Sequence, residues 1–185
     1  MYQATFHIKT ITPLFLSGSD PGKTEIRASS FKGLMRFWWR AVKEHKDLKD
    51  LNENEAELFG KTDYGKSPIK IKIDSHNTSI KESNNLKRAV SLDSCYDPKK
   101  RLLKGQDKGI AYLYFSMMMQ KRAFILPDSK FNLILSSSQQ DVIKNAIASF
   151  WLLIHLGGVG ARSRRGGGNL LVAVSYTHLT LPTKA

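Results

Sequence analysis

The order in which hydrophobic patterns of period 2 and period 3.6 follow one another constrains the fold of this chain most. Tyr2 to Lys9 alternate between apolar and polar residues, as half-buried strands do, and residues 69–73 repeat that pattern. Strand-like runs also occur at 110–115, 131–135 and 169–173. The helical period predicts helices at residues 31–46, 53–59 and 139–156. The helices separate the strands in the order β-α-β-β-α-β, with one additional strand at 110–115.

The expected helix ends coincide with capping residues. Ser30 is a candidate N-cap for the first helix, and Ser138 with Asp141 resembles a capping box for the last. Gly60 and Gly157 follow the second and last helices, as C-terminal glycines do. The split βαβ order is that of a ferredoxin-like, RRM-like α+β domain with an antiparallel sheet and two main helices.

The chain of 185 residues has the length of one domain, which we assign to residues 1–173. Within it, residues 75–108 are polar, lysine-rich and without periodicity, and we interpret them as a mobile insertion loop. Residues 174–183, VSYTHLTLPT, resemble the translated read-through of a transposon-type sequencing adapter. We therefore expect residues 174–185 to be an adapter-derived, non-native tail.

Charge and cysteine content limit the classes of partner. Lys plus Arg number 29 and Asp plus Glu 16, a net charge of +13 that favours a polyanion such as nucleic acid. An anionic membrane surface or an acidic protein would also suit this charge. Cys95 is the single cysteine, so neither an internal disulfide framework nor a cysteine-built zinc site is possible. The longest apolar stretch, 146–154, is too short to span a membrane, and no export signal is visible; we expect a cytoplasmic protein.

The first helix carries the clearest chemical pattern. One broad face is predicted to pack in the core and consists of Phe31, Leu34, Met35, Trp38, Ala41 and Val42. Lys32, Arg36, Arg40 and Lys43 share another face, and Trp39 lies on the border beside it. A basic stripe with an adjoining aromatic suits an RNA backbone with a base stacked on Trp39. The alternative is a solvated basic face with Trp39 half-buried in the core.

A second pattern is the glycine-rich basic loop at residues 157–168. Gly158 and Gly160 let backbone amides approach a phosphodiester, and Arg162, Arg164 and Arg165 supply donors matched to phosphate oxygens. A flexible link with solvated arginines is the alternative. The loop is no dinucleotide fingerprint, because it follows a helix and precedes a strand, the reverse of the required context.

Other catalytic or cofactor patterns are weak, and we expect no cofactor and no metal. Residues 17–24, SGSDPGKT, imitate a P-loop, but Asp20 would repel phosphates, Pro21 lacks an amide proton and no helix opens at Lys23. The histidines are scattered without metal-ligand spacing. His7 is the one placed candidate for a general base in a metal-independent ribonuclease.

Three blocks of sequence resemble one known family. Residues 11–15 with 25–41, ITPLF and EIRASSFKGLMRFWWRA, resemble the opening of the first RAMP subunit of the type III-B CRISPR (Cmr) effector. Residues 57–60, ELFG, resemble its next landmark, and residues 157–166, GGVGARSRRG, its glycine-rich loop. The loop alone would indicate only the RAMP superfamily.

The resemblance implies a non-catalytic RNA-binding subunit of an antiviral RNA-guided complex. Its partners would be guide RNA, target RNA and other RAMP subunits of the Cmr complex. The family's basic positions correspond to Arg27, Lys32, Arg36 and Arg40 in the first block, and to Arg162, Arg164 and Arg165 in the loop. Two alternatives stay open: a metal-independent RAMP endoribonuclease that cuts precursor guide RNA with His7 or a tyrosine, and a module that docks acidic proteins.

Overall fold

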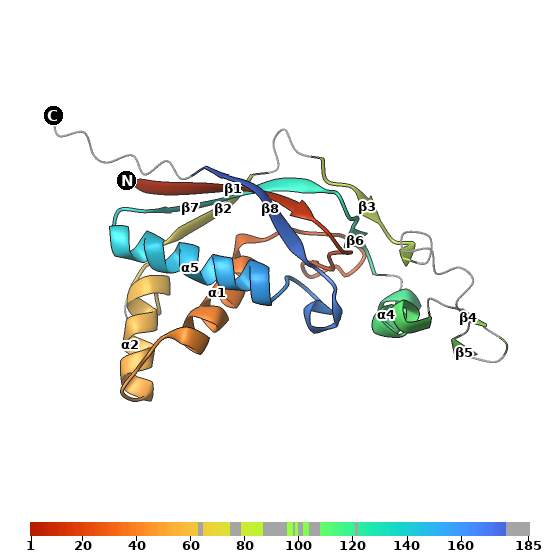
Figure 1. The fold of residues 1–185 in the computed structure, drawn as a ribbon, viewed down its shortest axis with the longest axis horizontal. Coiled ribbons are helices and arrows are strands. Elements are labelled where there is room, and N and C mark those ends of the chain that lie inside the picture. Colours follow the sequence, from red (N-terminus) through yellow and green to blue (C-terminus); the bar gives the residue numbers. More distant parts are fainter. Residues whose placement is uncertain are drawn as a thin grey trace.

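The computed structural model describes residues 1–62, 65–74, 79–86, 96–97, 99, 102–103, 108–120 and 122–176. Its main sheet has four antiparallel strands in the order β2-β7-β1-β8. These are β1 (Tyr2–Thr10), β2 (Lys70–Asp74), β7 (Lys130–Ser137) and β8 (Leu170–Tyr176). Helix α1 (Ala28–Val42) joins β1 to β2, and α5 (Gln140–Leu156) joins β7 to β8. The predicted α+β ferredoxin-like topology is confirmed (Figure 1).

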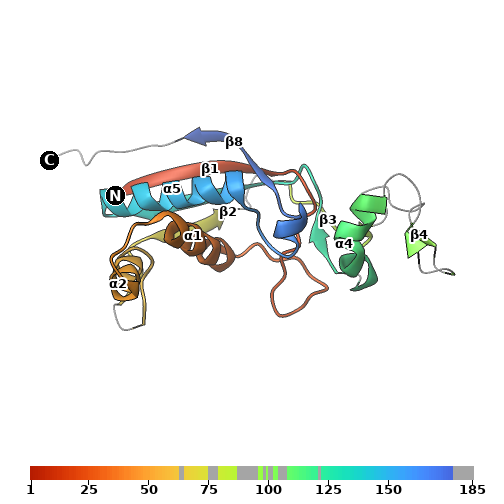
Figure 2. The ribbon, with the colours of Figure 1, turned by 60° about the horizontal axis from the view of Figure 1, so that its bottom comes forward.

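Three helices cover one face of the main sheet. Figures 1 and 2 show α1, α5 and α2 (Leu48–Phe59) on the same side. Ala4, Phe6 and Ile8 of β1 point into this layer and are buried, while the intervening residues are only half-buried or exposed. Phe6 packs against Phe150 of α5 with ring centroids 4.8 Å apart. The alternation of the sequence thus decides which face of the sheet the helices cover.

The helix ends differ from the prediction where a cap was inferred from residue type alone. α1 begins at Ala28 with Arg27 as N-cap, so the assignment of Ser30 is wrong, and it ends at Val42 rather than 46. α5 has Gln139 as N-cap without a side-chain cap, so the Ser138 capping box is also wrong. Gly60 does terminate α2, at φ 75°, a conformation that glycine adopts most readily.

α2 is longer than predicted because a cap was overlooked. Asp47 precedes the helix, and its carboxylate accepts a hydrogen bond from the amide of Asp50 at 2.8 Å. This bond satisfies one of the amides that the first turn leaves unpaired, so the helix extends over Leu48–Phe59 instead of 53–59.

The predicted strand at 110–115 is a helix. Residues Lys108–Gln120 form α4, and its buried side chains Ala111, Tyr114 and Met117 recur every three residues. Tyr114 and Met117 pack with Phe15 and Phe124 in a second, smaller core. Two short strand pairs lie near this helix in Figure 1: β3 (Glu82–Ser83) with β6 (Phe124–Ile125), and β4 (Tyr96–Asp97) with β5 (Leu102–Leu103).

The predicted insertion and tail are described only in part. Within 75–108, the structure describes 79–86, 96–97, 99, 102–103 and 108, and Leu86 is buried in the second core. β8 continues into the first three residues of the expected tail, since 174–176 pair with residues 5–7 of β1 after a register shift. Residues 177–185 lie outside the described part of the chain. Within the described residues, no helix is long and apolar enough to cross a membrane.

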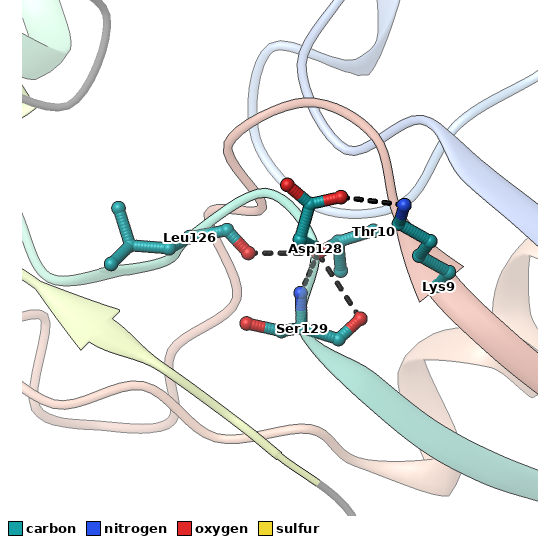
Figure 3. A network of polar contacts seen from close by, with 5 residues as sticks. All are labelled: Lys9, Thr10, Leu126, Asp128 and Ser129. Atoms are coloured by element: carbon teal, nitrogen blue, oxygen red, sulfur yellow. Dashed lines mark hydrogen bonds and ion pairs between the residues drawn. The ribbon is translucent and has the colours of Figure 1, made fainter.

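A cluster of polar contacts joins the end of β1 to the turn before β7 (Figure 3). The Thr10 hydroxyl donates to the Leu126 carbonyl at 2.8 Å and accepts from the Ser129 amide at 3.0 Å. Asp128 has φ 65°, and its carboxylate lies 2.6 Å from Lys9 Nζ. The hydrogen bond and charge of Lys9 lower the pKa of Asp128. These contacts hold the end of β1 against the turn that precedes β7.

Candidate nucleic-acid interface

An open groove of about 620 Å³ lies between α1 and the segment that follows α2. Its basic side chains come from Lys32 and Arg36 on α1 and from Lys61 after α2. The rest of the lining is Ser29, Gly33, Phe59, Gly60, Thr62, Gly65 and Ser67. No acidic side chain is among the described residues that line it. The groove is suited to phosphate because it combines ammonium, guanidinium and hydroxyl groups with glycine backbone that no side chain covers.

The environment of the groove lowers the pKa of Lys32. Burial lowers the pKa of Lys32, and the neighbouring charge of Arg36 lowers it further. Both causes disfavour the ammonium form in the free protein. A phosphate bound in the groove would oppose both.

Arg36 and Arg40 are tied to a buried carboxylate that the sequence analysis missed. Arg36 Nε donates to Glu55 Oε1, and Arg40 Nε lies 3.5 Å from Glu55 Oε2. The side chain of Glu55 is 4% exposed, whereas those of Arg36 and Arg40 are 37% and 48% exposed. The two arginines therefore have a structural role in joining α1 to α2, and each keeps part of its surface open to solvent.

Arg27 lies at the start of the same helix but holds a loop. Its Nη2 donates to the Ser17 carbonyl at 3.3 Å, and its Nε is 3.9 Å from Glu25 Oε2. It is not among the groove residues. Arg27 thus anchors the segment before α1, and nearly half of its side chain is exposed.

The prediction that Trp39 forms a stacking platform beside the basic stripe is wrong. Trp39 is 5% exposed, packs edge-on against Phe59 and donates through Nε1 to Asn145 Oδ1 at 3.3 Å. The buried face of α1 is Phe31, Met35 and Trp39. Trp38, predicted to be the core residue, is only partly buried, and Val42 is exposed.

The glycines of the 157–168 loop serve the packing of the protein itself. Gly160 has φ 84°, and a Cβ there would collide with the Phe15 carbonyl oxygen. Gly168 has φ 66°, and a Cβ there would collide with the Val159 carbonyl oxygen. Gly158 is buried, with Gly167 and Asn169 around it. The close backbone approach expected at Gly158 and Gly160 is therefore made to the chain's own backbone.

The three arginines of this loop are not equivalent. Arg162 adopts φ 67°, and its Nη2 donates to the Ser116 hydroxyl of α4. Arg164 and Arg165 lie in a single 3₁₀ turn, Ser163–Arg165, and are exposed. The Tyr114 hydroxyl donates to the Gly166 carbonyl at 3.0 Å, and burial raises the pKa of Tyr114. α4 thus supports the turn that presents Arg164 and Arg165.

The structure does not bring the first-helix groove and the glycine loop into one cavity, since no loop residue lines the groove. The two predicted patterns are separate basic surfaces. Helix α1 meets the loop where Trp38 lies against Gly157, the first residue of the loop.

The two catalytic alternatives lie away from the groove. His7 points from the sheet face opposite the helices, and its Nδ1 is 2.7 Å from Asn132 Oδ1 on β7. In the P-loop-like segment, the Asp20 carboxylate accepts from the Gly22 amide at 2.8 Å. α1 begins only at Ala28, so no helix N-terminus follows Lys23 as a P-loop would require.

Comparison with known proteins agrees with this arrangement. The family model of the RAMP superfamily matches residues 7–171. The CRISPR system Cmr subunit Cmr1-2 of Pyrococcus furiosus is 30% identical over 188 residues, which cover 93% of this chain and 96% of that protein. The crystal structure of apo Cmr1 from Pyrococcus furiosus superposes with a TM-score of 0.71 at 29% identity, over 97% of this chain and 51% of that one.

A more distant structure shares the fold alone. A chain in the cryo-EM structure of type III-B Cmr-beta bound to cognate target RNA gives a TM-score of 0.61 at 14% identity, over 96% of this chain and 55% of that one. This chain thus spans about half the length of the two solved relatives and nearly all of Cmr1-2. The chain belongs to the RAMP superfamily and, within it, to the Cmr1 subunits of CRISPR systems.

Proposed function

We propose that this chain is a non-catalytic RNA-binding subunit of a type III-B CRISPR effector in antiviral defence. It holds guide RNA, or the duplex of guide and target, through contacts to phosphates. Guide pairing then supplies the sequence specificity, and the protein supplies a shaped cationic surface. The proposal includes other Cmr subunits and target RNA as partners and the cytoplasm as location, because the relatives are named as Cmr subunits.

The groove of Lys32, Arg36 and Lys61 is the observation that carries the proposal. Its basic groups converge on one volume, its hydroxyls and glycine backbone can donate to phosphate oxygens, and carboxylates are absent from its described lining. The exposed Arg164 and Arg165 form a second surface for the same polyanion. Phosphate contacts of this kind fix position without reading bases, which suits a protein that must accept any guide sequence.

Binding is tested with a fluorescein-labelled oligoadenylate titrated against the chain in EDTA, read by anisotropy. Lys32→Ala should weaken binding several-fold and reduce the slope of log affinity against log salt by about 0.7. Lys144→Ala removes an equal charge from the exposed face of α5 and serves as the matched control. An equal loss in both variants would mean that the groove is not the site, and no binding by the parent chain would overturn the proposal.

The same incubation distinguishes the enzymatic alternative. Gel analysis of a repeat-derived RNA in EDTA should show retention without cleavage. Cleavage that His7→Ala abolishes would overturn the non-catalytic assignment, because a general base on β1 would then be at work.

A further inference from the structure

A second cavity adjoins the first-helix groove at the edge of the sheet. It has a volume of about 400 Å³, and Ser67 lines both cavities. Its basic groups are Lys66 and Lys70, which are both exposed. The remaining lining is Met1, Ser67, Pro68, Ser136, Ser137 and Ser138.

The second cavity repeats the chemistry of the first with new residues. Lys70 and Ser136 are direct register partners on β2 and β7, so their side chains lie on the same sheet face. The Ser137 hydroxyl accepts from the Gln139 amide at 3.1 Å, which leaves its own proton to donate. Two ammonium groups beside three successive serines, of which Ser138 is exposed and Ser136 and Ser137 are buried at the cavity wall, provide charge and hydrogen-bond donors for phosphate oxygens.

A cavity elsewhere on the molecule shows that a lysine-lined cavity is not always free of carboxylates. The cavity between α1, α2 and α5 also contains a lysine, Lys43, but Glu57 and Asp141 line it as well. The two cavities that meet at Ser67 have no carboxylate among their described lining residues. Lysines on an edge strand also discourage strand pairing, but that role requires neither Lys66 nor the serines.

The path through the two cavities bends around the sheet. Lys32 and Arg36 belong to α1, which covers the helical face, whereas Lys70 projects from the opposite face of the edge strand β2. Ile71, the next residue, packs against the core, which fixes this orientation of Lys70. A rigid duplex cannot follow a turn around a strand edge, but a single strand of RNA can.

We propose that the two cavities form one continuous cationic track that holds successive phosphates of a single RNA strand as it turns around the β2 edge at Ser67. The track assigns a binding role to Lys66 and Lys70, and it specifies an unpaired segment of RNA as the ligand. This inference rests on the proposed function, since it extends the groove that carries that proposal.

The test compares Lys66→Ala/Lys70→Ala with Lys49→Ala/Lys144→Ala, which removes the same charge from exposed positions on α2 and α5. With labelled oligoadenylate, the first variant should reduce the salt slope by about 1.4, at roughly 0.7 per phosphate, and weaken binding about tenfold, while the control changes little. The parent should prefer the single strand to a duplex of equal length, and the variant should lose that preference.

The outcomes separate the track from the proposed function. If Lys32→Ala weakens binding but Lys66→Ala/Lys70→Ala behaves like the control, the proposed function stands and the track is wrong. If the parent chain prefers the duplex, the track is wrong as well. If the parent binds no RNA, the proposed function itself fails.

Discussion

Replacing Glu55 by glutamine should lower the stability of the domain and raise its affinity for RNA. The carboxylate is buried, accepts a hydrogen bond from Arg36 and forms an ion pair with Arg40, so the fold depends on it. A hydrogen bond to a charged group contributes about 1.5–3 kcal/mol. The glutamine carbonyl can still accept from Arg36, but that bond then lacks the negative charge, and the ion pair with Arg40 is lost. We therefore expect Glu55→Gln to reduce the free energy of unfolding by about 1.5–3 kcal/mol.

Removing Arg36 should lower the free energy of unfolding more than Glu55→Gln does. Arg36→Ala leaves a carboxylate that is 4% exposed with only the longer contact to Arg40, and breaking a buried ion pair in this way costs about 3–5 kcal/mol. The two arginines can be rehydrated when Glu55 is removed because both are partly exposed. A larger loss of stability from Arg36→Ala than from Glu55→Gln is what a buried carboxylate paired with partly exposed arginines predicts.

The gain in RNA affinity follows from the charge that is removed. At a separation of about one Debye length, 8 Å, a unit charge contributes about 2 kcal/mol at an effective dielectric of about 20. Screening leaves about a third of this, which is roughly threefold in affinity. Urea denaturation measures the loss of stability of Glu55→Gln. Anisotropy with oligoadenylate at equal folded fraction measures its gain in RNA affinity.

Glu53→Gln is the matched control, because Glu53 lies on the same helix and its side chain is 46% exposed, against 4% for Glu55. It should change stability by less than about 0.5 kcal/mol. An unchanged stability of Glu55→Gln would refute the structural role of the carboxylate. Weaker RNA binding by Glu55→Gln than by Glu53→Gln would refute the idea that Glu55 partly neutralises Arg36 as a phosphate ligand of the groove.

Four further variants test other parts of the molecule. Trp39→Ala should lower the free energy of unfolding by about 3–5 kcal/mol in a denaturant titration; a loss of RNA affinity at unaltered stability would contradict its core position. Arg164→Ala/Arg165→Ala should reduce the salt slope of RNA binding by about 1.4 at unaltered melting temperature, and an unaltered slope would remove both from the interface. Deletion of residues 177–185 should leave the melting temperature unchanged if the tail is adapter-derived. Deletion of 174–185 should lower the melting temperature, because 174–176 pair with β1; equal midpoints would contradict this.

The topology could be predicted from the sequence because each element carries its own period. The alternation of β1 is visible in the sequence, and Ala4, Phe6 and Ile8 are buried as it predicts. The glycine after α2 marks a helix end that requires a positive φ. Segments of this kind are fixed by local sequence, and the order of the elements then leaves few arrangements of the sheet.

The failures occur where tertiary contacts decide. A short apolar aromatic run such as 110–115 fits a buried strand and a buried helix equally well, and packing against Phe15 and Phe124 selects the helix. Trp38 and Trp39 both border the apolar arc of α1, and nothing in the helix itself specifies which flank faces α2. Glu55 has acidic neighbours at 53 and 57, and only its burial against α1 distinguishes it.

Lys32 links the electrostatics of the groove to a measurable pH dependence. Burial and Arg36 lower the pKa of Lys32 in the free protein, so the unfolded chain holds this proton to higher pH than the folded one. Folding stability from this group therefore rises with pH between the lowered pKa and the ordinary lysine value. Bound phosphate reverses the effect, because it favours the ammonium form and draws a proton into the complex. RNA affinity should accordingly fall as the pH rises from the lowered pKa of Lys32 toward the ordinary lysine value, measured by anisotropy with oligoadenylate. Lys32→Arg keeps the charge throughout this range and should remove most of the dependence. The same fall in both proteins would mean that another group titrates, and that the phosphate does not lie beside Lys32.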